Sequence, residues 1–324
     1  MKCTNKRLLS IYLSLIILIS LTGCGNSGLN LAYRDSYNYS TDGVILGTAD
    51  TFSKDLCVIN DDERGKLGND VEDTAAAGLF CVDDKTVLYA KDVHKTFYPA
   101  SLTKVMTALV AIKYGNMTDT IVCSENVDKL ESGASRCGLK PGDRISMDDA
   151  LHALLVSSAN DAAIAIAEHV SGTTEGFVAL MNKEARALGA TNTNFVNPNG
   201  LNDEEHYTTV YDLYLITNAA VKYDYFINII SDIEYQSIYK DSEGNDKKLE
   251  LKTTNLFLKG DYSSPDTVTV IGGKTGTTNA ALNCLIQVVG DKQNKTYIAI
   301  ILHVSERDII NSEMEELLQE ITAE

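Results

Sequence analysis

Strand patterns occur early and late in this chain, and helix patterns lie between them. Short strand patterns cover 77–82 and 86–89, and apolar or alternating runs cover 282–289 and 296–304. Residues 306–322 are amphipathic at helical spacing. Strands at the two ends of a domain pack most economically in one sheet that helices cover. We therefore predict an α+β fold whose antiparallel sheet is built from both chain ends, flanked by helices and joined to a helical lobe.

The first 23 residues have the pattern of an export signal. Three basic residues precede an apolar run, 8–21, that is too short for a comfortable membrane span. The run ends in Leu21-Thr22-Gly23-Cys24, which resembles the bacterial lipoprotein cleavage box, where the cysteine takes a diacylglycerol. An ordinary secretory signal with an incidental cysteine is the alternative. Both predict a mature protein outside the cytoplasm, and the first predicts lipid anchoring through Cys24 to the outer face of the bacterial cell membrane.

The charge of the chain excludes some classes of partner. Its net charge is −17, and removal of residues 1–23, which hold three cations and no acids, makes it −20. Such a chain is unsuited to nucleic acid or to electrostatic docking on anionic lipid. Residues 24–74 are polar and lack periodicity, so we predict a flexible tether with one short strand at 56–59. Residues 75–324 are predicted to form the folded domain.

Seven cysteines are present, and five remain once the signal and Cys24 are set aside. An odd number cannot all pair. Cys123 and Cys137 could bridge a loop, whereas Cys81 and Cys284 are predicted to be free thiols packed in strands. No Cys/His spacing is typical of a metal site, and we predict neither a metal nor another cofactor.

Ser101 and Lys104 lie at the start of an apolar helix pattern that follows Pro99 and precedes Gly115. Their spacing puts both side chains on one helix face. A serine hydroxyl needs a base within hydrogen-bond reach, and a lysine amine is that base only while it is neutral. Burial and a second nearby cation favour the neutral amine. Alone, the pair is weak evidence, since an N-cap serine and a solvated lysine are common in helices.

A second polar group, Ser157-Ser158-Ala159-Asn160-Asp161, falls between two helix patterns at 145–156 and 161–170. Side chains in such a gap can point into a cleft. The tripeptide Ser158-Ala159-Asn160 alone predicts no more than a helix N-cap.

The third group is Gly272-Gly273-Lys274-Thr275-Gly276-Thr277-Thr278, which opens a strand. Its glycines allow close backbone approach to a ligand, Lys274 adds a cation, and the threonines add hydroxyls. A phosphate-binding loop is excluded because the order of glycines and lysine differs and no helix follows.

The order S-x-x-K, S-x-N and K-T-G is the signature shared by penicillin-binding proteins and serine β-lactamases. Over roughly residues 75–304 the sequence resembles the low-molecular-mass D-alanyl-D-alanine carboxypeptidases in particular. Further landmarks of that resemblance are Asn194–Leu201, His206–Thr209 and Thr254-Asn255.

The sequence departs from that family's pattern at three places. Ala159 stands where the family usually has glycine, and Thr277 follows the K-T-G motif as is common in β-lactamases. The chain ends at Glu324, before the β-rich second domain and membrane-binding helix of many members. A lipid at Cys24 would replace that anchor.

The resemblance implies acyl transfer through a serine ester. Ser101 would attack the carbonyl of the penultimate D-alanine of a peptidoglycan stem peptide, and Lys104 would accept its proton. Ser158 would pass a proton to the leaving amine, bridging Lys104 and Lys274. Asn160 would hydrogen-bond the substrate peptide. Penicillins and other β-lactams would acylate the same serine as covalent inhibitors.

The resemblance also implies how the substrate is held. Lys274 would attract the terminal carboxylate, and Thr275 and Thr277 would bind it beside Gly276. Backbone N–H groups of Ser101 and Thr277 would form the oxyanion hole. The sequence does not show which residue, if any, supplies an arginine-like clamp for the carboxylate.

Three alternatives share the signature. A β-lactamase would need a carboxylate to activate the deacylating water, for which Glu204 and Glu205 are the candidates. An endopeptidase that cuts D-Ala crosslinks would use the same site. A β-lactam-binding lipoprotein would acylate without turnover. A Ser-His-Asp triad is disfavoured, because none of the five histidines lies in a nucleophile-elbow context.

Overall fold

The structure is a computed structural model that describes residues 52–59 and 76–322. The chain forms two units, residues 1–54 and 55–324, and a short 3-10 helix, η1 (Phe52–Asp55), spans their boundary. All other elements belong to the second unit. The predicted export signal, Cys24 and most of the predicted tether lie outside the described residues. Among the residues described, no helix is long and apolar enough to cross a membrane.

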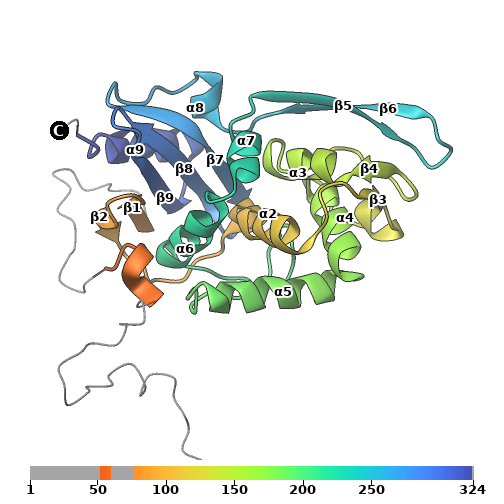
Figure 1. Cartoon of the computed structure of the whole chain (residues 1–324), viewed down its shortest axis with the longest axis horizontal. Coiled ribbons are helices and arrows are strands. Elements are labelled where there is room, and N and C mark those ends of the chain that lie inside the picture. Colours follow the sequence, from red (N-terminus) through yellow and green to blue (C-terminus); the bar gives the residue numbers. More distant parts are fainter. Residues whose placement is uncertain (1–51, 60–75, 323–324) are drawn as a thin grey trace, which may run out of the picture. The chain divides into compact units, whose positions relative to one another are not determined.

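A five-stranded antiparallel sheet forms one part of the second unit (Figure 1). Its strands, in spatial order, are β2 (Thr86–Lys91), β1 (Ala76–Cys81), β9 (Thr296–Val304), β8 (Leu282–Asp291) and β7 (Val268–Thr278). The early strands join the late ones where β1 pairs with β9. The prediction of an antiparallel sheet built from both ends of the domain is confirmed. Among the strands that the structure describes, β7 is the last of this sheet, so one row of its backbone groups has no strand partner there.

Both faces of this sheet are buried. All six residues of β1 are buried, and successive side chains of a strand point to opposite faces. Leu79 belongs to an apolar cluster with Met314 and Leu317 of the terminal helix α9 (Arg307–Leu318). Phe80 joins the cluster on the other face, where its ring stacks on Tyr214 at 4.3 Å between centroids.

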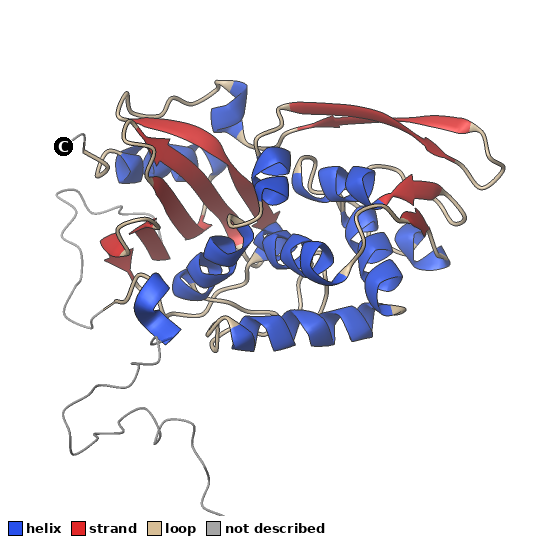
Figure 2. Cartoon of the chain, viewed as in Figure 1, coloured by secondary structure: helices blue, strands red, loops and turns tan. Residues whose placement is uncertain are grey.

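Most helices gather in a lobe away from α9 (Figure 2). They are η2 (Ala100–Leu102), α2 (Thr103–Tyr114), η3 (Glu125–Asp128), α3 (Met147–Leu155), α4 (Asn160–Ser171), α5 (Thr174–Ala187), α6 (Val210–Ala220) and α7 (Asp224–Ile230), while α8 (Leu256–Lys259) precedes β7. Nine of the twelve residues of α2 are buried, so this helix lies in the core of the lobe. Lys104, a residue of the site described below, belongs to this buried helix.

The capping residues follow the sequence. The Ser146 side chain accepts a hydrogen bond from the backbone N–H of Asp149 at the start of α3, and Thr209 does the same at the start of α6. Gly172 ends α4 with a φ of 79°, a conformation that costs glycine little.

A second, four-stranded sheet in the order β3 (Thr120–Val122), β4 (Arg144–Ser146), β5 (Glu234–Lys240) and β6 (Asp246–Lys252) is not in the prediction. The hairpin β5–β6 alternates charged with apolar residues and leaves Ile238 60% exposed. Ile145, expected to open a helix, lies in β4 instead, because α3 begins only after its cap at Ser146.

The strand predicted at 56–59 is also wrong. Residue Cys57 is buried, but its backbone is not paired with a strand. Its N–H donates to the Tyr214 hydroxyl at 2.8 Å, and its carbonyl accepts from the Tyr211 hydroxyl at 2.8 Å. Side chains of α6 therefore satisfy the backbone groups that a sheet would otherwise satisfy.

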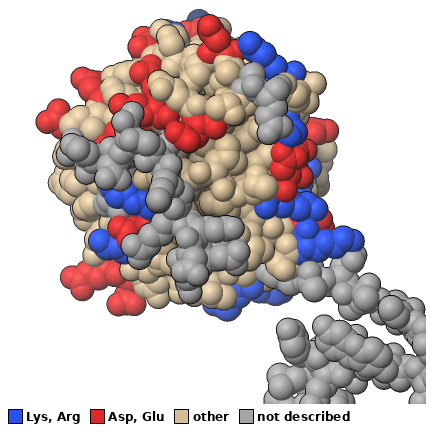
Figure 3. Space-filling model, turned by 90° about the vertical axis from the view of Figure 1, so that its left-hand side faces the viewer, with Lys and Arg blue, Asp and Glu red and all other residues tan. Residues whose placement is uncertain are grey.

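Charged side chains are mixed on the face shown in Figure 3, the left-hand side of Figure 1. Lysine and arginine residues lie in small groups beside aspartate and glutamate, and no extended basic surface is visible on the part of that face that the structure describes.

Candidate active site

Ser101 lies in the single 3-10 turn η2 that leads into α2, and Lys104 follows at the start of the α-helix. The ammonium nitrogen Nζ of Lys104 is 2.8 Å from Ser101 Oγ, so the two side chains meet as the spacing predicts. Ser101 itself was expected in the first turn of an α-helix. The tighter 3-10 turn follows from Ala100, whose φ of 48° is outside the helical range.

The strained backbone at Ala100 is supported by the turn at 197–200. The Ala100 carbonyl accepts a hydrogen bond from Thr103 Oγ1, which also contacts His206 Nε2 at 2.8 Å. Gly200 has a φ of 84°, and a Cβ added there would lie 1.9 Å from the Ala100 carbonyl oxygen. Only glycine therefore allows this turn to pack against the residue before Ser101.

His206 takes part in positioning and lies outside the cavity of the nucleophile. Burial lowers the pKa of His206 to about 4, so its ring is neutral at pH 7. Its Nδ1 accepts from the backbone N–H of Val196 at 3.1 Å. The proton is then on Nε2, which donates to Thr103. These contacts give His206 a structural role.

Lys104 is completely buried and has three oxygen neighbours. Besides Ser101, its Nζ donates to Asn160 Oδ1 at 2.8 Å and to the Asn199 carbonyl at 2.6 Å. Burial, and secondly the nearby charge of Lys274, hold the pKa of Lys104 well below its usual value, and Asp161 opposes the shift. A neutral amine beside the serine hydroxyl is the form that accepts a proton.

Ser158 lies in the gap between α3 and α4, where the sequence placed it. Its φ of 62° is rare for a residue with a side chain, and such strain is held by the surrounding structure. Lys274 Nζ donates to Ser158 Oγ at 2.9 Å and to the Thr275 carbonyl at 2.8 Å. Burial lowers the pKa of Lys274 to about 7. In the described part of the chain Ser158 has no hydrogen bond to Lys104, so only half of the expected bridge is present.

The Lys-Thr-Gly segment lies in the second half of β7, with Lys274 and Gly276 buried and Thr277 exposed. A Cβ added to Gly276 would come within 3.1 Å of the Ser101 backbone nitrogen. The missing side chain lets the edge strand lie directly against η2. It thereby brings the backbone of Thr277 next to the nucleophile.

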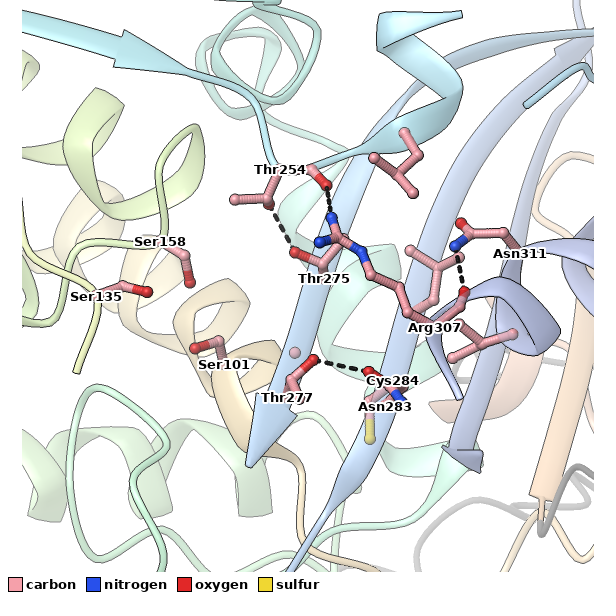
Figure 4. Close-up of a pocket in the computed structure, with 14 residues that line it drawn as sticks. Ser101, Ser135, Ser158, Thr254, Thr275, Thr277, Asn283, Cys284, Arg307 and Asn311 are labelled. Carbon is pink, nitrogen blue, oxygen red and sulfur yellow. Dashed lines mark hydrogen bonds between the residues drawn. The ribbon is translucent and has the colours of Figure 1, made fainter. Parts of the chain in front are cut away.

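A cavity of about 220 Å³ opens between these segments (Figure 4). Its lining includes Ser101, Ser158, Thr254, Thr275, Gly276, Thr277 and Arg307. Three further side chains lie behind the serines and do not line the cavity, those of Lys104, Lys274 and Asn160. Lys104 is hydrogen-bonded to Ser101 and Asn160, and Lys274 is hydrogen-bonded to Ser158. The three sequence motifs thus converge on one cavity.

Arg307 is a cavity residue that sequence reasoning missed. It begins α9, and its guanidinium reaches across β7 to donate to the Thr254 carbonyl at 3.3 Å (Figure 4). Thr254 and Thr275 share a hydrogen bond of 2.6 Å between their hydroxyls. No motif marks an arginine that is 33 positions beyond Lys274 in the sequence, and only the fold brings it here.

Asp161 holds the wall that carries Ser135. Its carboxylate is fully buried and accepts the backbone N–H groups of Cys137, Gly138 and Leu139 at 2.8–3.0 Å. The Ser135 carbonyl in turn accepts from the Asn160 N–H at 2.8 Å. The loop before β4 is thereby tied to the start of α4, where Asn160 contacts Lys104.

The remaining cysteine and glutamate predictions can now be compared with the structure. Cys57, Cys81, Cys123, Cys137 and Cys284 are all free, so the bridge considered between Cys123 and Cys137 is not formed. Glu204 lines a second cavity instead of the one that holds Ser101.

Comparisons with known proteins identify the family of the chain. The model of the D-alanyl-D-alanine carboxypeptidase family, peptidase S11, matches residues 67–306. The chain belongs to this family, and the resemblance inferred from the motifs is confirmed.

Two curated relatives illustrate the match. The chain is 35% identical over 243 residues to D-alanyl-D-alanine carboxypeptidase DacF of Bacillus subtilis, covering 73% of this chain and 59% of the relative. It is 31% identical over 221 residues to DacB2 of Mycobacterium tuberculosis, covering 68% of this chain and 71% of the relative. The chain spans less than two thirds of the length of several other relatives, such as 58% of DacA from Haemophilus influenzae.

Solved structures show the same architecture. The crystal structure of the Streptomyces K15 DD-transpeptidase is 26% identical and superposes with a TM-score of 0.71, covering 76% of this chain and 96% of that one. The predicted α+β fold class is therefore confirmed by comparison as well as by topology.

Proposed function

We propose that the protein is a serine D-alanyl-D-alanine carboxypeptidase that removes the terminal D-alanine from peptidoglycan stem pentapeptides and is inhibited by penicillins. The observation that carries this proposal is the contact of Ser101 with a buried Lys104 whose pKa is lowered, at the cavity that Ser101, Ser158 and Thr275 line. Family membership and the names of the relatives support it.

Acylation begins with proton transfer from Ser101 Oγ to Lys104 Nζ over their 2.8 Å contact. The oxygen attacks the carbonyl carbon of the penultimate D-alanine, and the carbonyl oxygen takes the negative charge. We assign the oxyanion hole to the backbone N–H groups of Ser101 and Thr277, because Gly276 brings the strand against η2. In other acyl-transfer enzymes one such donor is worth about 3–4 kcal/mol.

The bond to the terminal D-alanine breaks when its nitrogen gains a proton. We assign this delivery to Ser158, which is hydrogen-bonded to Lys274. Rotation of the Ser158 hydroxyl toward the leaving nitrogen would let Ser158 give its proton and regain one from the lysines. Water then attacks the ester carbonyl, and the shortened peptide leaves.

The terminal carboxylate is assigned to the far side of the cavity. Thr275 and Thr277 supply hydroxyls, Lys274 supplies a charge behind them, and Arg307 adds a guanidinium that suits a carboxylate. The edge strand β7 offers free backbone groups along which an extended peptide can add as a further strand. Asn160, already bonded to Lys104, is assigned to the peptide group of the substrate.

Lipid anchoring is a further part of the proposal. The box that ends in Cys24 supports a mature protein tethered to the outer face of the cell membrane, with residues 24–74 as the spacer to the domain at 75–324. A lipid on the cysteine would hold the domain close to its polymeric substrate.

Release of D-alanine from diacetyl-Lys-D-Ala-D-Ala tests the proposed function. The wild-type protein should release D-alanine, and Ser101→Ala should not. A crosslinked dimer and a chromogenic cephalosporin, tested in parallel, measure endopeptidase and β-lactamase activity. Faster turnover of either than of the peptide would contradict the assignment as a carboxypeptidase.

A further inference from the structure

We propose that a second cavity, beside Tyr98, binds the side chain of the stem-peptide residue that precedes D-Ala-D-Ala, and that Glu204 pairs with a free amino group on that side chain. The proposal rests on the proposed carboxypeptidase function and names the substrate more closely. The ligand is thus a peptide with a basic diamino acid at that position and an unmodified side-chain amine.

The cavity measures about 290 Å³ and has aromatic walls with one acidic residue. The rings of Phe97, Tyr98, Tyr207 and His303 line it together with Glu204. Aromatic walls suit the methylene stem of a long side chain, and a carboxylate suits the ammonium at its end.

Its position follows from the two segments that meet at the active site. Tyr98 is three residues before Ser101, and Ala280, which also lines this cavity, is three residues after Thr277. Thr275 and Arg307, which we assign to the terminal carboxylate of the substrate, lie at the opposite end of the Ser101 cavity (Figure 4). The second cavity is therefore on the upstream side of the scissile bond.

The direction of the substrate gives the same result. A peptide that adds antiparallel to β7 with its carboxylate at Thr275 has its N-terminal part running toward Thr278 and Ala280. An extended chain advances about 3.3 Å per residue, so the residue before the penultimate D-alanine lies one step beyond Ser101. Its side chain can then enter the cavity next to Tyr98.

The charge in this cavity favours an amine. Glu204 is exposed, and its carboxylate has no hydrogen-bond or ion-pair partner among the residues that the structure describes. Lys95 Nζ already lies 5.2 Å from the ring centroid of Phe97, so this aromatic wall tolerates an ammonium on its face. A substrate ammonium can therefore form an ion pair with the Glu204 carboxylate while it lies beside these rings.

The backbone of His303, one of the residues that line this cavity, is strained. Its φ is 66°, and its ring lies 5.4 Å from that of Phe97. Its Nδ1 is 3.3 Å from the Ala281 carbonyl, at the turn between β7 and β8. A strained residue of this kind persists only where the neighbouring structure fixes it. Here the strained backbone orients the imidazole of His303 so that it forms part of the cavity wall.

The proposal has a consequence for substrate choice. The side-chain amine of the third residue becomes an amide when a stem peptide accepts a crosslink, and an amide nitrogen carries no charge to pair with Glu204. The enzyme should therefore prefer uncrosslinked stems.

The test compares two substrates that differ only in that amine, Nα-acetyl-Lys-D-Ala-D-Ala and diacetyl-Lys-D-Ala-D-Ala. The readout is the ratio of their kcat/KM values for D-alanine release within each variant. We expect the wild-type protein to prefer the free amine about fivefold, as an exposed ion pair would give. Glu204→Gln should bring the ratio close to one.

Glu205→Gln is the matched control, because it removes the same charge from the neighbouring exposed residue, which does not line the cavity. It should keep the wild-type ratio. A wild-type ratio of one, or a ratio that Glu204→Gln leaves unchanged, would overturn the proposal while D-alanine release still supports the carboxypeptidase function. If neither peptide were hydrolysed, the proposed function and this inference would both fail.

Discussion

At the scale of single residues, the proposed chemistry depends on two buried lysines, Lys104 and Lys274. Each is removed from water, and both pKa values lie below the ordinary lysine value because burial disfavours the charged form. The charge of Lys274 further lowers the pKa of Lys104. In the proposed mechanism, Lys104 is the base for Ser101 and Lys274 supplies positive charge near the cavity.

The pKa of about 7 for Lys274 predicts a pH dependence of substrate binding. Below that pH the amine is charged and attracts the terminal carboxylate, and above it the charge is lost. We expect the KM for diacetyl-Lys-D-Ala-D-Ala to rise as the pH is raised through about 7. Lys274→Arg keeps its charge at every pH used and should remove this rise. A wild-type KM that is constant between about pH 6 and pH 8 would count against the assignment.

Asp161 is predicted to act by positioning. Asp161→Asn replaces one of the two oxygens that accept backbone N–H groups from the 137–139 segment. Hydrogen bonds to a charged group contribute about 1.5–3 kcal/mol, so the free energy of unfolding should fall by about that amount in urea denaturation. Asp266→Asn, at an exposed position, should change it by no more than about 0.5 kcal/mol. Equal stabilities of the two variants would contradict the role given to Asp161.

At the scale of elements, the site depends on how closely η2, β7 and the turn at 197–200 approach one another. Gly276 permits the first contact and Gly200 the second. The sequence shows the glycines but not their neighbours. Resemblance to a family can therefore mark a motif glycine as important. The structure is needed to show which opposing backbone atoms leave no room for a side chain at that position.

Gly200→Ala tests this packing, with Gly244→Ala as its control. Both glycines have positive φ values, 84° and 89°, but an added Cβ meets the Ala100 backbone at position 200 and nothing within 4 Å at position 244. Gly244→Ala should cost about 1–2 kcal/mol of unfolding free energy from backbone strain alone.

Gly200→Ala should lose more stability than that and should slow acylation by a fluorescent penicillin, because Asn199 moves away from Lys104. Similar losses of stability in both variants, with wild-type acylation, would show that the contact with Ala100 is unimportant.

Element predictions succeeded where periodicity and caps agree. The strand at 76–81 is apolar throughout, and the strand at 296–304 is apolar apart from Thr296, Tyr297 and His303. The helix caps at Ser146 and Thr209 are visible in the sequence. The hairpin β5–β6 was missed because its charged residues resemble a loop, and its stability comes from pairing along seven residues of each strand. The strand predicted at 56–59 failed because tyrosine hydroxyls replaced its partner strand.

At the scale of the whole molecule, the sequence allowed the three motifs of the proposed site to be identified but not their geometry. Ser101, Ser158 and Lys274 are brought together by the packing of α2, α4 and β7, and Arg307 joins them from the last helix. The proximity of Arg307 and the second cavity at Glu204 depend on tertiary structure alone. The signal and Cys24 are sequence predictions, since they lie outside the described residues.

Lipid anchoring is tested on the whole chain. The protein made in a bacterial host should fractionate with membranes, and Cys24→Ala should move it to the soluble fraction or leave its signal uncut. Because the net charge is strongly negative, high salt should not release the wild-type protein, as it would release an electrostatically bound one. Release of the wild-type protein by salt would contradict a lipid anchor.

The most direct test of the account is covalent labelling of the intact protein with a penicillin, followed by mass measurement and peptide mapping. We predict one added penicilloyl group, carried by the peptide that contains Ser101, and no addition to Ser101→Ala. An unlabelled wild-type protein, or a Ser101→Ala variant that still gains the same mass, would contradict the claim that Ser101 and Lys104 form the acylating pair.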